Sequence, residues 1–195
     1  KLFDQLNDFF NDSFEVVYIA SPNSLHFSQA KIALVAGKHV ILEKPAVTQP
    51  HEWQELIEIA QENQRFIFEA ARNYHENAFE LVKDFLADKH VLGADFNYAK
   101  YSSKMPELLA GNTPNVFSDR FAGGALMDLG IYPLYAAIRL FGKPNRATYQ
   151  AQQLDNSIDL NGDGILSYPD YQVHIKAGKN ITSNLPCEIY TTDGT

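Results

Sequence analysis

A lysine that follows a short apolar run is the first residue with chemical potential. The run covers residues 40–42, and Glu43, Lys44 and Pro45 follow it directly. Parallel strands buried on both faces have this apolar character, and their carboxyl ends open into the crevice where α/β sheets bind ligands. A lysine there can take part in proton transfer, and the proline stiffens the backbone that carries it. Without further context, a solvated strand end is the simpler interpretation.

A second polar turn strengthens the functional interpretation. Ser21, Pro22, Asn23 and His26 follow the preceding apolar run, at residues 14–20. Two neighbouring strands would then both end in polar residues on the ligand side of one sheet. The alternative is that Ser21 and Asn23 are ordinary turn residues, and that His26 is an ordinary first-turn helix residue.

A carboxylate and a phenol four residues apart form the second group. Gly123 and Gly124 precede Asp128 and Tyr132 in a segment with helical character. Glycines permit close approach of the backbone, and side chains four residues apart on a helix are neighbours. Together with Lys44, the acid and the phenol would suit proton transfer to or from a substrate hydroxyl. The alternative is a helix entry with a chance acid and a half-buried tyrosine.

Residues 159–164 resemble the first half of a calcium-binding EF-hand loop. Acids or amides occupy its first, third and fifth positions, and glycine the sixth. The twelfth position is Asp170, where such loops need the longer glutamate. The flanks should also be helical, whereas residues 165–175 alternate like a strand and contain Pro169. We therefore expect a turn between strands, and no metal site.

The pattern of elements around these residues predicts an α/β protein with two domains. Up to residue 70 the chain alternates strand, helix, strand, helix, strand with short connections, which indicates right-handed parallel crossovers. After a further helix at residues 76–88, a helix at 123–142 and several sequential strands indicate an α+β arrangement. We predict a partial Rossmann parallel sheet in residues 1–74 and an α+β substrate domain with a mainly antiparallel open sheet in residues 75–195.

Pro133 conflicts with one uninterrupted helix over residues 123–142. A proline removes a backbone donor and crowds the preceding turn. Either the helix kinks at Pro133, or its regular part begins near Ile131 with the proline in its first turn.

Composition limits the partners and the compartment. The chain has 195 residues, 45% of them hydrophobic, and a formal net charge of −8. This acidic balance, with no basic cluster, argues against nucleic acid or an anionic membrane as partner. The single cysteine, Cys187, excludes an internal disulfide framework and suits a reducing compartment. We expect a soluble cytoplasmic protein that acts on a small molecule.

In combination, the motifs resemble those of the glucose–fructose oxidoreductase and inositol dehydrogenase family, often called Gfo/Idh/MocA. The matching segments are residues 17–26, 36–45, 69–72 and 123–132, in family order and at family spacing. The resemblance extends over nearly the whole chain. It implies an oxidoreductase that uses NAD or NADP, with a Rossmann domain and an α/β domain whose open sheet often forms homodimers or higher oligomers.

The resemblance also implies roles for individual residues. Lys44 corresponds to the family's catalytic lysine, and Asp128 to the acid that helps hold the substrate. Tyr132 occupies a position that is histidine in inositol-dehydrogenase-like members, so this chain is similar to the tyrosine-type, dihydrodiol dehydrogenase branch. The implied substrate is a sugar, polyol or dihydrodiol. The implied cofactor-binding residues are Ser21, Pro22, Asn23, His26, Glu43, Lys44, Pro45 and Arg72.

Two residues, Lys44 and Tyr132, are candidates for the group that relays the proton. In the oxidation direction, the substrate hydroxyl loses a proton while its carbon loses hydride to nicotinamide. The positive charge of oxidised nicotinamide and desolvation would both lower the pKa of Lys44. A cationic Lys44 would in turn favour ionisation of Tyr132. We take Tyr132 as acid and base, Lys44 as its electrostatic partner and co-relay, and Asp128 as the orienting carboxylate.

One motif of the family is not in this sequence. No GxGxxG turn occurs, although a Rossmann domain needs such a turn for the cofactor pyrophosphate. The chain opens in what resembles the helix before the fourth family strand, so we expect an internal fragment. The second hypothesis is therefore a binding or dimerisation module without a cofactor. The sequence does not choose between NAD and NADP.

Overall fold

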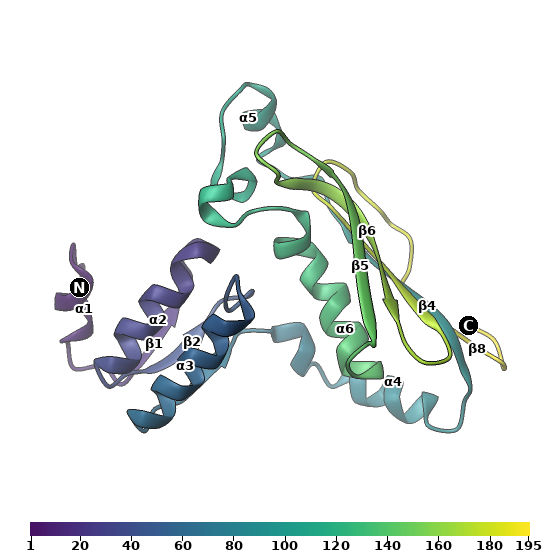
Figure 1. The fold of residues 1–195 in the computed structure, drawn as a ribbon, viewed down its shortest axis with the longest axis horizontal. Coiled ribbons are helices and arrows are strands. Elements are labelled where there is room, and N and C mark those ends of the chain that lie inside the picture. Colours follow the sequence, from purple (N-terminus) through teal and green to yellow (C-terminus); the bar gives the residue numbers. More distant parts are fainter. The chain divides into compact units, whose positions relative to one another are not determined.

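The computed structural model describes residues 1–195, and it separates into two compact units, Lys1–Ala71 and Arg72–Thr195. Figure 1 labels their elements along the chain. The helices and strands of unit 1 are α1 (Leu6–Phe10), β1 (Val16–Ile19), α2 (His26–Val35), β2 (His39–Leu42), α3 (Pro50–Glu62) and β3 (Ile67–Glu69).

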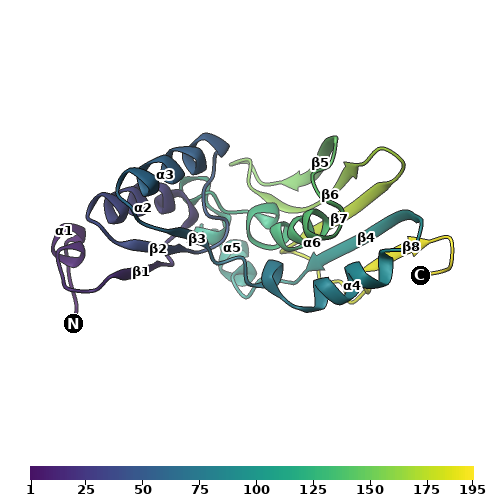
Figure 2. The same cartoon turned by 90° about the horizontal axis from the view of Figure 1, so that it is seen from below.

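Unit 1 is built on a parallel sheet with the strand order β1-β2-β3. Helices α2 and α3 cover one face of this sheet (Figure 2). Alternate strand residues, such as Val17 in β1 and Val40 in β2, point toward these helices and are buried, as are Leu34 and Leu56 on the helices. Each such side chain stabilises the fold by roughly 1.5–3 kcal/mol. The predicted alternation of strands and helices is therefore confirmed.

Helix α1 is shorter than the sequence pattern predicted. The apolar residues at the start of the chain favour a helix over residues 1–11, but the structure has one only at Leu6–Phe10. Phe3 packs edge-on against Phe9, with ring centroids 5.6 Å apart. Phe3 therefore packs against the helix without extending it, whereas Leu2 is exposed.

Unit 2 is an α+β arrangement. Its main elements are α4 (Ala78–Leu86), β4 (Val91–Ala99), α5 (Met105–Leu109), the π-helical turn η5 (Leu126–Gly130), α6 (Ile131–Phe141), β5 (Arg146–Gln153), β6 (Asp159–Ser167), β7 (Gln172–Gly178) and β8 (Glu188–Thr191). The strand order is β5-β6-β7-β4-β8, and only the β4–β7 pair is parallel. The predicted fold class, a parallel sheet followed by a mainly antiparallel open sheet, is confirmed.

Helix α6 packs against one face of this second sheet (Figure 1). The core between them includes Phe96 in β4, Val173 in β7 and Ala137 in α6. The apolar segment Asp119–Phe141 includes this helix, has a mean hydropathy of 1.3 and would pass for a membrane span by length and composition alone. In the structure the segment is divided into a 3-10 turn, the π turn η5 and helix α6.

The conflict at Pro133 is resolved in favour of the second alternative. Helix α6 begins at Ile131, so Pro133 lies in its first turn. An N–H at this position has no partner within the helix, so its absence in proline costs little. The residues before it form the π turn η5, which contains Asp128.

Two predictions about the strands were wrong. Residues 165–175, which alternate like a single strand, form parts of two strands, β6 and β7, and residues 159–164 belong to β6 instead of a turn. The glycines of β6 explain the error, because they make room for side chains across the sheet. A Cβ on Gly162 would lie 2.4 Å from the Tyr149 ring, and one on Gly164 would lie 2.7 Å from Ile175.

Candidate active site

A buried histidine joins the two polar turns of unit 1. The His26 side chain is fully buried, and it starts α2 directly after the turn that follows β1. Its Nδ1 lies 2.9 Å from the carbonyl oxygen of Pro45, and its Nε2 lies 2.8 Å from that of Ser21. The imidazole thus connects the end of β1 to the end of β2. Its position suits a residue that holds the two turns in place.

Two carboxylates hold the backbone around Lys44. Glu43 accepts hydrogen bonds from the hydroxyl of Tyr18 and, at 3.0 Å, from the N–H of Lys44. The hydrogen bond to Glu43 also raises the pKa of Tyr18. Glu69, at the end of β3, accepts a 2.8 Å hydrogen bond from the N–H of Ala46. The peptide bond between Lys44 and Pro45 is cis. The backbone that carries Lys44 is therefore fixed from both neighbouring strands.

The strand ends of unit 1 fit one end of a dinucleotide. The three strands are parallel, so their carboxyl ends meet at one edge, where α/β sheets bind cofactors. Ser21, Asn23 and Lys44 follow these ends and provide hydroxyl, amide and ammonium groups. Such groups suit the carboxamide and ribose hydroxyls of a nicotinamide nucleotide. The pyrophosphate requires a glycine-rich turn, and this sequence contains none, so the fit is limited to the nicotinamide end.

In unit 2, one buried carboxylate caps the helical segment that carries the predicted acid and phenol. Asp159 accepts hydrogen bonds from the N–H of Ala125 at 2.9 Å and from that of Leu126 at 2.7 Å. It also accepts one from the hydroxyl of Tyr149 at 2.7 Å. Burial, with this hydrogen bond, raises the pKa of the Tyr149 phenol. A negative charge at the start of a helix is favourable because it meets unsatisfied N–H groups and the positive end of the helix dipole.

The paired glycines are explained by this cap. Gly124 has φ +119°, and a Cβ there would lie 2.1 Å from Oδ1 of Asp159. A Cβ on Gly123 would lie 2.5 Å from the carbonyl oxygen of Val116. The sequence predicted that these glycines permit close approach of the backbone. In the structure, the groups that lie close to them are the Asp159 carboxylate and the Val116 carbonyl of the protein itself.

Asp128 and Tyr132 lie on consecutive turns, Asp128 in η5 and Tyr132 in the first turn of α6. Asp128 forms an ion pair with Lys179, a buried lysine that directly follows β7. The Tyr132 ring packs edge-to-face on Tyr98, with centroids 5.1 Å apart. Tyr132 lines a hollow of about 380 Å³ together with Arg72, Asn73, Glu76 and Tyr98.

The structure thus groups the predicted residues in two sets. Ser21, His26 and Pro45 are joined in unit 1, where Lys44 also lies. Asp128, Tyr132 and Arg72 belong to unit 2. The side chain of Arg72 is 92% exposed and pairs with Glu76 at 3.7 Å, which leaves it accessible to a ligand of the hollow.

Comparison with known proteins decides the family. Residues 1–71 match the family model described as an oxidoreductase family with an NAD-binding Rossmann fold. Residues 93–195 match the GFO/IDH/MocA C-terminal domain. The chain belongs to the GFO/IDH/MocA oxidoreductase family. The predicted resemblance is thereby confirmed.

Individual relatives agree with this family. The uncharacterized oxidoreductase YgjR of Escherichia coli is 38% identical over 92% of this chain and 55% of its own length. The scyllo-inositol 2-dehydrogenase (NADP(+)) IolU of Bacillus subtilis is 35% identical over 95% of this chain and 57% of its own length. The solved structure of an NAD-binding protein from Listeria innocua has a TM-score of 0.81 at 18% identity, covering 98% of this chain and 57% of that one. This GFO/IDH/MocA chain spans about half the length of the relatives it matches.

Sequence reasoning missed two residues of the unit 2 site and misinterpreted a third. Tyr98, in β4, packs on Tyr132, and Lys179 pairs with Asp128. Asp159 was noticed, but only as part of a calcium-like pattern. A lysine that directly follows the apolar, small residues Ala177 and Gly178 was the one local signal for Lys179.

Proposed function

We propose that the protein containing this chain is an oxidoreductase that transfers hydride between NAD or NADP and a hydroxyl-bearing carbon of a sugar, polyol or dihydrodiol. The observation that carries the proposal is the pair Asp128 and Tyr132 on consecutive turns, with Tyr132 beside the polar hollow of unit 2. A phenol and a carboxylate so placed can accept a proton and orient a substrate hydroxyl.

The substrate class draws on relatives. IolU is a scyllo-inositol 2-dehydrogenase. A mouse relative, 30% identical over 91% of this chain, is a trans-1,2-dihydrobenzene-1,2-diol dehydrogenase. A fungal relative, 29% identical over 62% of this chain, is a D-xylose 1-dehydrogenase. All three names describe oxidation of a carbon that bears a hydroxyl group. The shared chemistry supports a polyhydroxylated substrate for this protein.

In the proposed mechanism, a nicotinamide held at the strand ends of unit 1 would supply the hydride acceptor. Tyr132 takes the proton of the reacting hydroxyl as that hydroxyl becomes a carbonyl. For Lys44, in unit 1, we propose the role of electrostatic partner and co-relay, since a cation favours the ionised form of a phenol. Asp128 accepts a hydrogen bond from a hydroxyl of the substrate and so fixes its orientation. In the reduction direction Tyr132 returns the proton.

The first test is substrate-dependent reduction of the cofactor by the full-length protein. Absorbance at 340 nm is followed with NAD⁺ or NADP⁺ and, in turn, scyllo-inositol, D-xylose and trans-1,2-dihydrobenzene-1,2-diol. We expect turnover of at least one of these compounds with at least one cofactor. No turnover in either direction, with the corresponding ketones and lactone included, would refute the proposed function.

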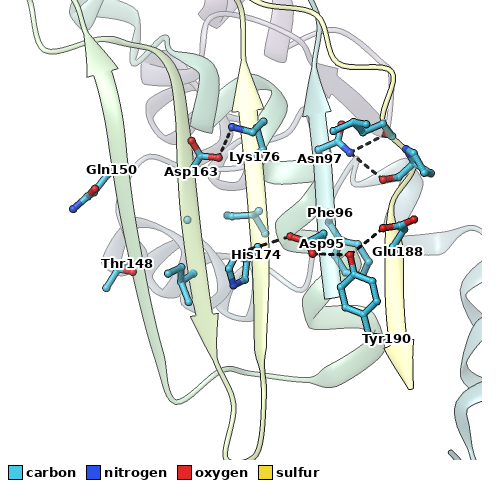
Figure 3. Close-up of a pocket in the computed structure, with 15 residues that line it drawn as sticks. Asp95, Phe96, Asn97, Thr148, Gln150, Asp163, His174, Lys176, Glu188 and Tyr190 are labelled. Carbon is cyan, nitrogen blue, oxygen red and sulfur yellow. Dashed lines mark hydrogen bonds and ion pairs between the residues drawn. The ribbon is translucent and has the colours of Figure 1, made fainter. Parts of the chain in front are cut away.

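We also propose that the protein self-associates through the open face of the second sheet. Figure 3 shows Asp95, His174, Lys176 and Tyr190 on that face, from the strands β4, β7 and β8. The face has a hollow of about 670 Å³, and Ile165, which lines it, is 36% exposed. A mixed polar and apolar surface of this kind suits contact between copies.

Light scattering tests this second proposal. The full-length protein should have at least the mass of a dimer, and Ile165→Asp should reduce it to that of a monomer. Leu109→Asp is the matched control, because Leu109 is 75% exposed on α5. A monomeric wild type, or an unchanged mass in Ile165→Asp, would contradict the proposal.

The alternative function, for residues 1–195 taken alone, is a binding module that uses no cofactor, because no GxGxxG turn occurs in this sequence. Calorimetry with NADH and NADPH on residues 1–195 tests this alternative. Micromolar binding of either nucleotide excludes the module.

The cytoplasm is the compartment we propose, because the lone Cys187 is an exposed free thiol, which suits reducing conditions.

A further inference from the structure

A buried lysine lies behind the predicted substrate-orienting acid. Lys179 is 4% exposed, although lysine is almost never buried unless it is paired. Its backbone N–H donates to the carbonyl of Leu160 at 2.7 Å, and its own carbonyl accepts a hydrogen bond from the N–H of Ser102, also at 2.7 Å. The backbone of Lys179 is therefore fixed by neighbouring chain segments on both sides.

The ammonium group of Lys179 pairs with the carboxylate of Asp128. Its Nζ forms an ion pair with Oδ2 of Asp128 and lies 6.0 Å from the centre of the Phe117 ring. Phe117 is fully buried, so the surroundings of Nζ on that side are apolar. A buried charge of this kind is costly unless its partner and the geometry are well defined.

The two partners differ in exposure, and this difference suggests a direction for the pair. The side chain of Lys179 is 5% exposed, whereas that of Asp128 is 36% exposed. The lysine thus holds Asp128 from the protein interior, while part of the carboxylate remains accessible to a ligand. A carboxylate has about four lone-pair sites, so one ammonium does not use up its capacity to accept hydrogen bonds.

The packing between helix and sheet makes this contact possible. Gly130, the last residue of the π turn η5, would place a Cβ 3.1 Å from the Cβ of Ala177 in β7. The absence of a side chain at Gly130 lets the turn that contains Asp128 lie close to the end of β7. Lys179 follows that end and can therefore reach the acid.

We propose that Lys179 is a positioning residue for Asp128, holding its carboxylate in the orientation that accepts a hydrogen bond from a hydroxyl of the substrate. The inference rests on the proposed function and adds to it a residue that acts through Asp128. Because the pair lies in unit 2, loss of Lys179 should affect substrate binding and leave the cofactor-binding turns of unit 1 unchanged.

The test uses the full-length protein, with the compound that it oxidises fastest among scyllo-inositol, D-xylose and trans-1,2-dihydrobenzene-1,2-diol. Lys179→Met should raise KM for that compound about 10- to 100-fold, the range expected for a hydrogen bond to a charged group. The Kd for NADPH or NADH should stay within about twofold of the wild type. Lys179→Arg, which keeps the cation, should restore part of the loss.

Two controls separate this role from a structural one. Lys104→Met removes an exposed lysine of unit 2 that pairs with Glu107 at 3.1 Å, and it should leave KM unchanged. If Lys179→Met fails to fold, the neutral pair Asp128→Asn with Lys179→Gln replaces it, and its KM should equal that of Asp128→Asn alone.

The outcomes separate the two claims. A wild type without dehydrogenase activity would refute the proposed function and the inference with it. An active wild type together with an unchanged KM in Lys179→Met would overturn the inference alone. In the replacement pair, a KM well above that of Asp128→Asn would overturn it as well, because the lysine would then act independently of the acid.

Discussion

Replacing Asp159 by alanine should destabilise the start of the helical segment that carries Asp128 and Tyr132. The carboxylate of Asp159 accepts hydrogen bonds from two backbone N–H groups and from the Tyr149 hydroxyl. Alanine would leave all of these donors without that partner. Ala125, which carries one of the donors, is fully buried, so water cannot easily replace the carboxylate there.

The magnitude follows from the number and kind of the lost bonds. Loss of an N-terminal helix cap costs about 1 kcal/mol, and a hydrogen bond to a charged group contributes roughly 1.5–3 kcal/mol. These contributions are not additive, because the three bonds share one carboxylate. For Asp159→Ala we expect a loss of about 3 kcal/mol in the free energy of unfolding of unit 2. Asp159→Asn keeps one acceptor oxygen and should lose about half as much.

Amide hydrogen exchange measures this effect at its origin. The N–H groups of Ala125 and Leu126 should exchange about 10²-fold faster in Asp159→Ala, since a tenfold change corresponds to about 1.4 kcal/mol. Urea unfolding followed by near-ultraviolet circular dichroism gives the accompanying loss of stability. Asp163→Ala is the matched control, because Asp163 is in the same strand and pairs with Lys176 on the open face. An exposed pair contributes roughly 0–1 kcal/mol. If Asp159→Ala were no more destabilising than Asp163→Ala, the assigned capping role would be wrong.

Three further predictions concern stability. Gly124→Ala should lower the free energy of unfolding, measured in urea, by roughly 1–3 kcal/mol, because φ is +119° there and the new Cβ would meet Asp159. A urea midpoint equal to that of the wild type would contradict this prediction. Burial raises the pKa of Tyr168 to about 12. As the pH rises above about 10, Tyr168 therefore loses its hydroxyl proton in the unfolded state before it does so in the folded state. The wild type should accordingly lose stability relative to Tyr168→Phe between about pH 10 and 12. A pH-independent difference between the two proteins would refute that statement. His26→Ala should lower the melting temperature and weaken NADPH binding by disordering the turns it joins, so unchanged values of both would argue against its assigned role.

Local sequence pattern predicted much of unit 1 because its contacts follow from periodicity. The apolar run of β2 and the alternating burial in β1 come from short-range order along the chain. The spacing of Asp128 and Tyr132 likewise predicted that they lie on consecutive helical turns. In each case the deciding interactions involve neighbours in sequence, or elements joined by short connections.

The errors have a common physical origin in contacts between distant residues. Strand β6 was taken for a turn because its glycines look like loop residues, whereas Tyr149 and Ile175 on the adjacent strands require them. The Asp128–Lys179 pair joins residues 51 positions apart, so no local pattern reveals it. Asp159 resembled a calcium ligand for the same reason, since its partners at the helix start are 33 and 34 residues away.

Turnover of two variants of the full-length protein tests the central claim most directly. Lys44→Ala and Tyr132→Phe remove the two groups to which we assign the proton transfer. Each should lower kcat for the polyol substrate by at least about 10²-fold. In Tyr132→Phe, whose site lies in unit 2, the Kd for NADPH or NADH should change little. Tyr98→Phe, which keeps the ring that packs on Tyr132, is the control and should retain turnover. Wild-type kcat in both Lys44→Ala and Tyr132→Phe would contradict the assignment of this site.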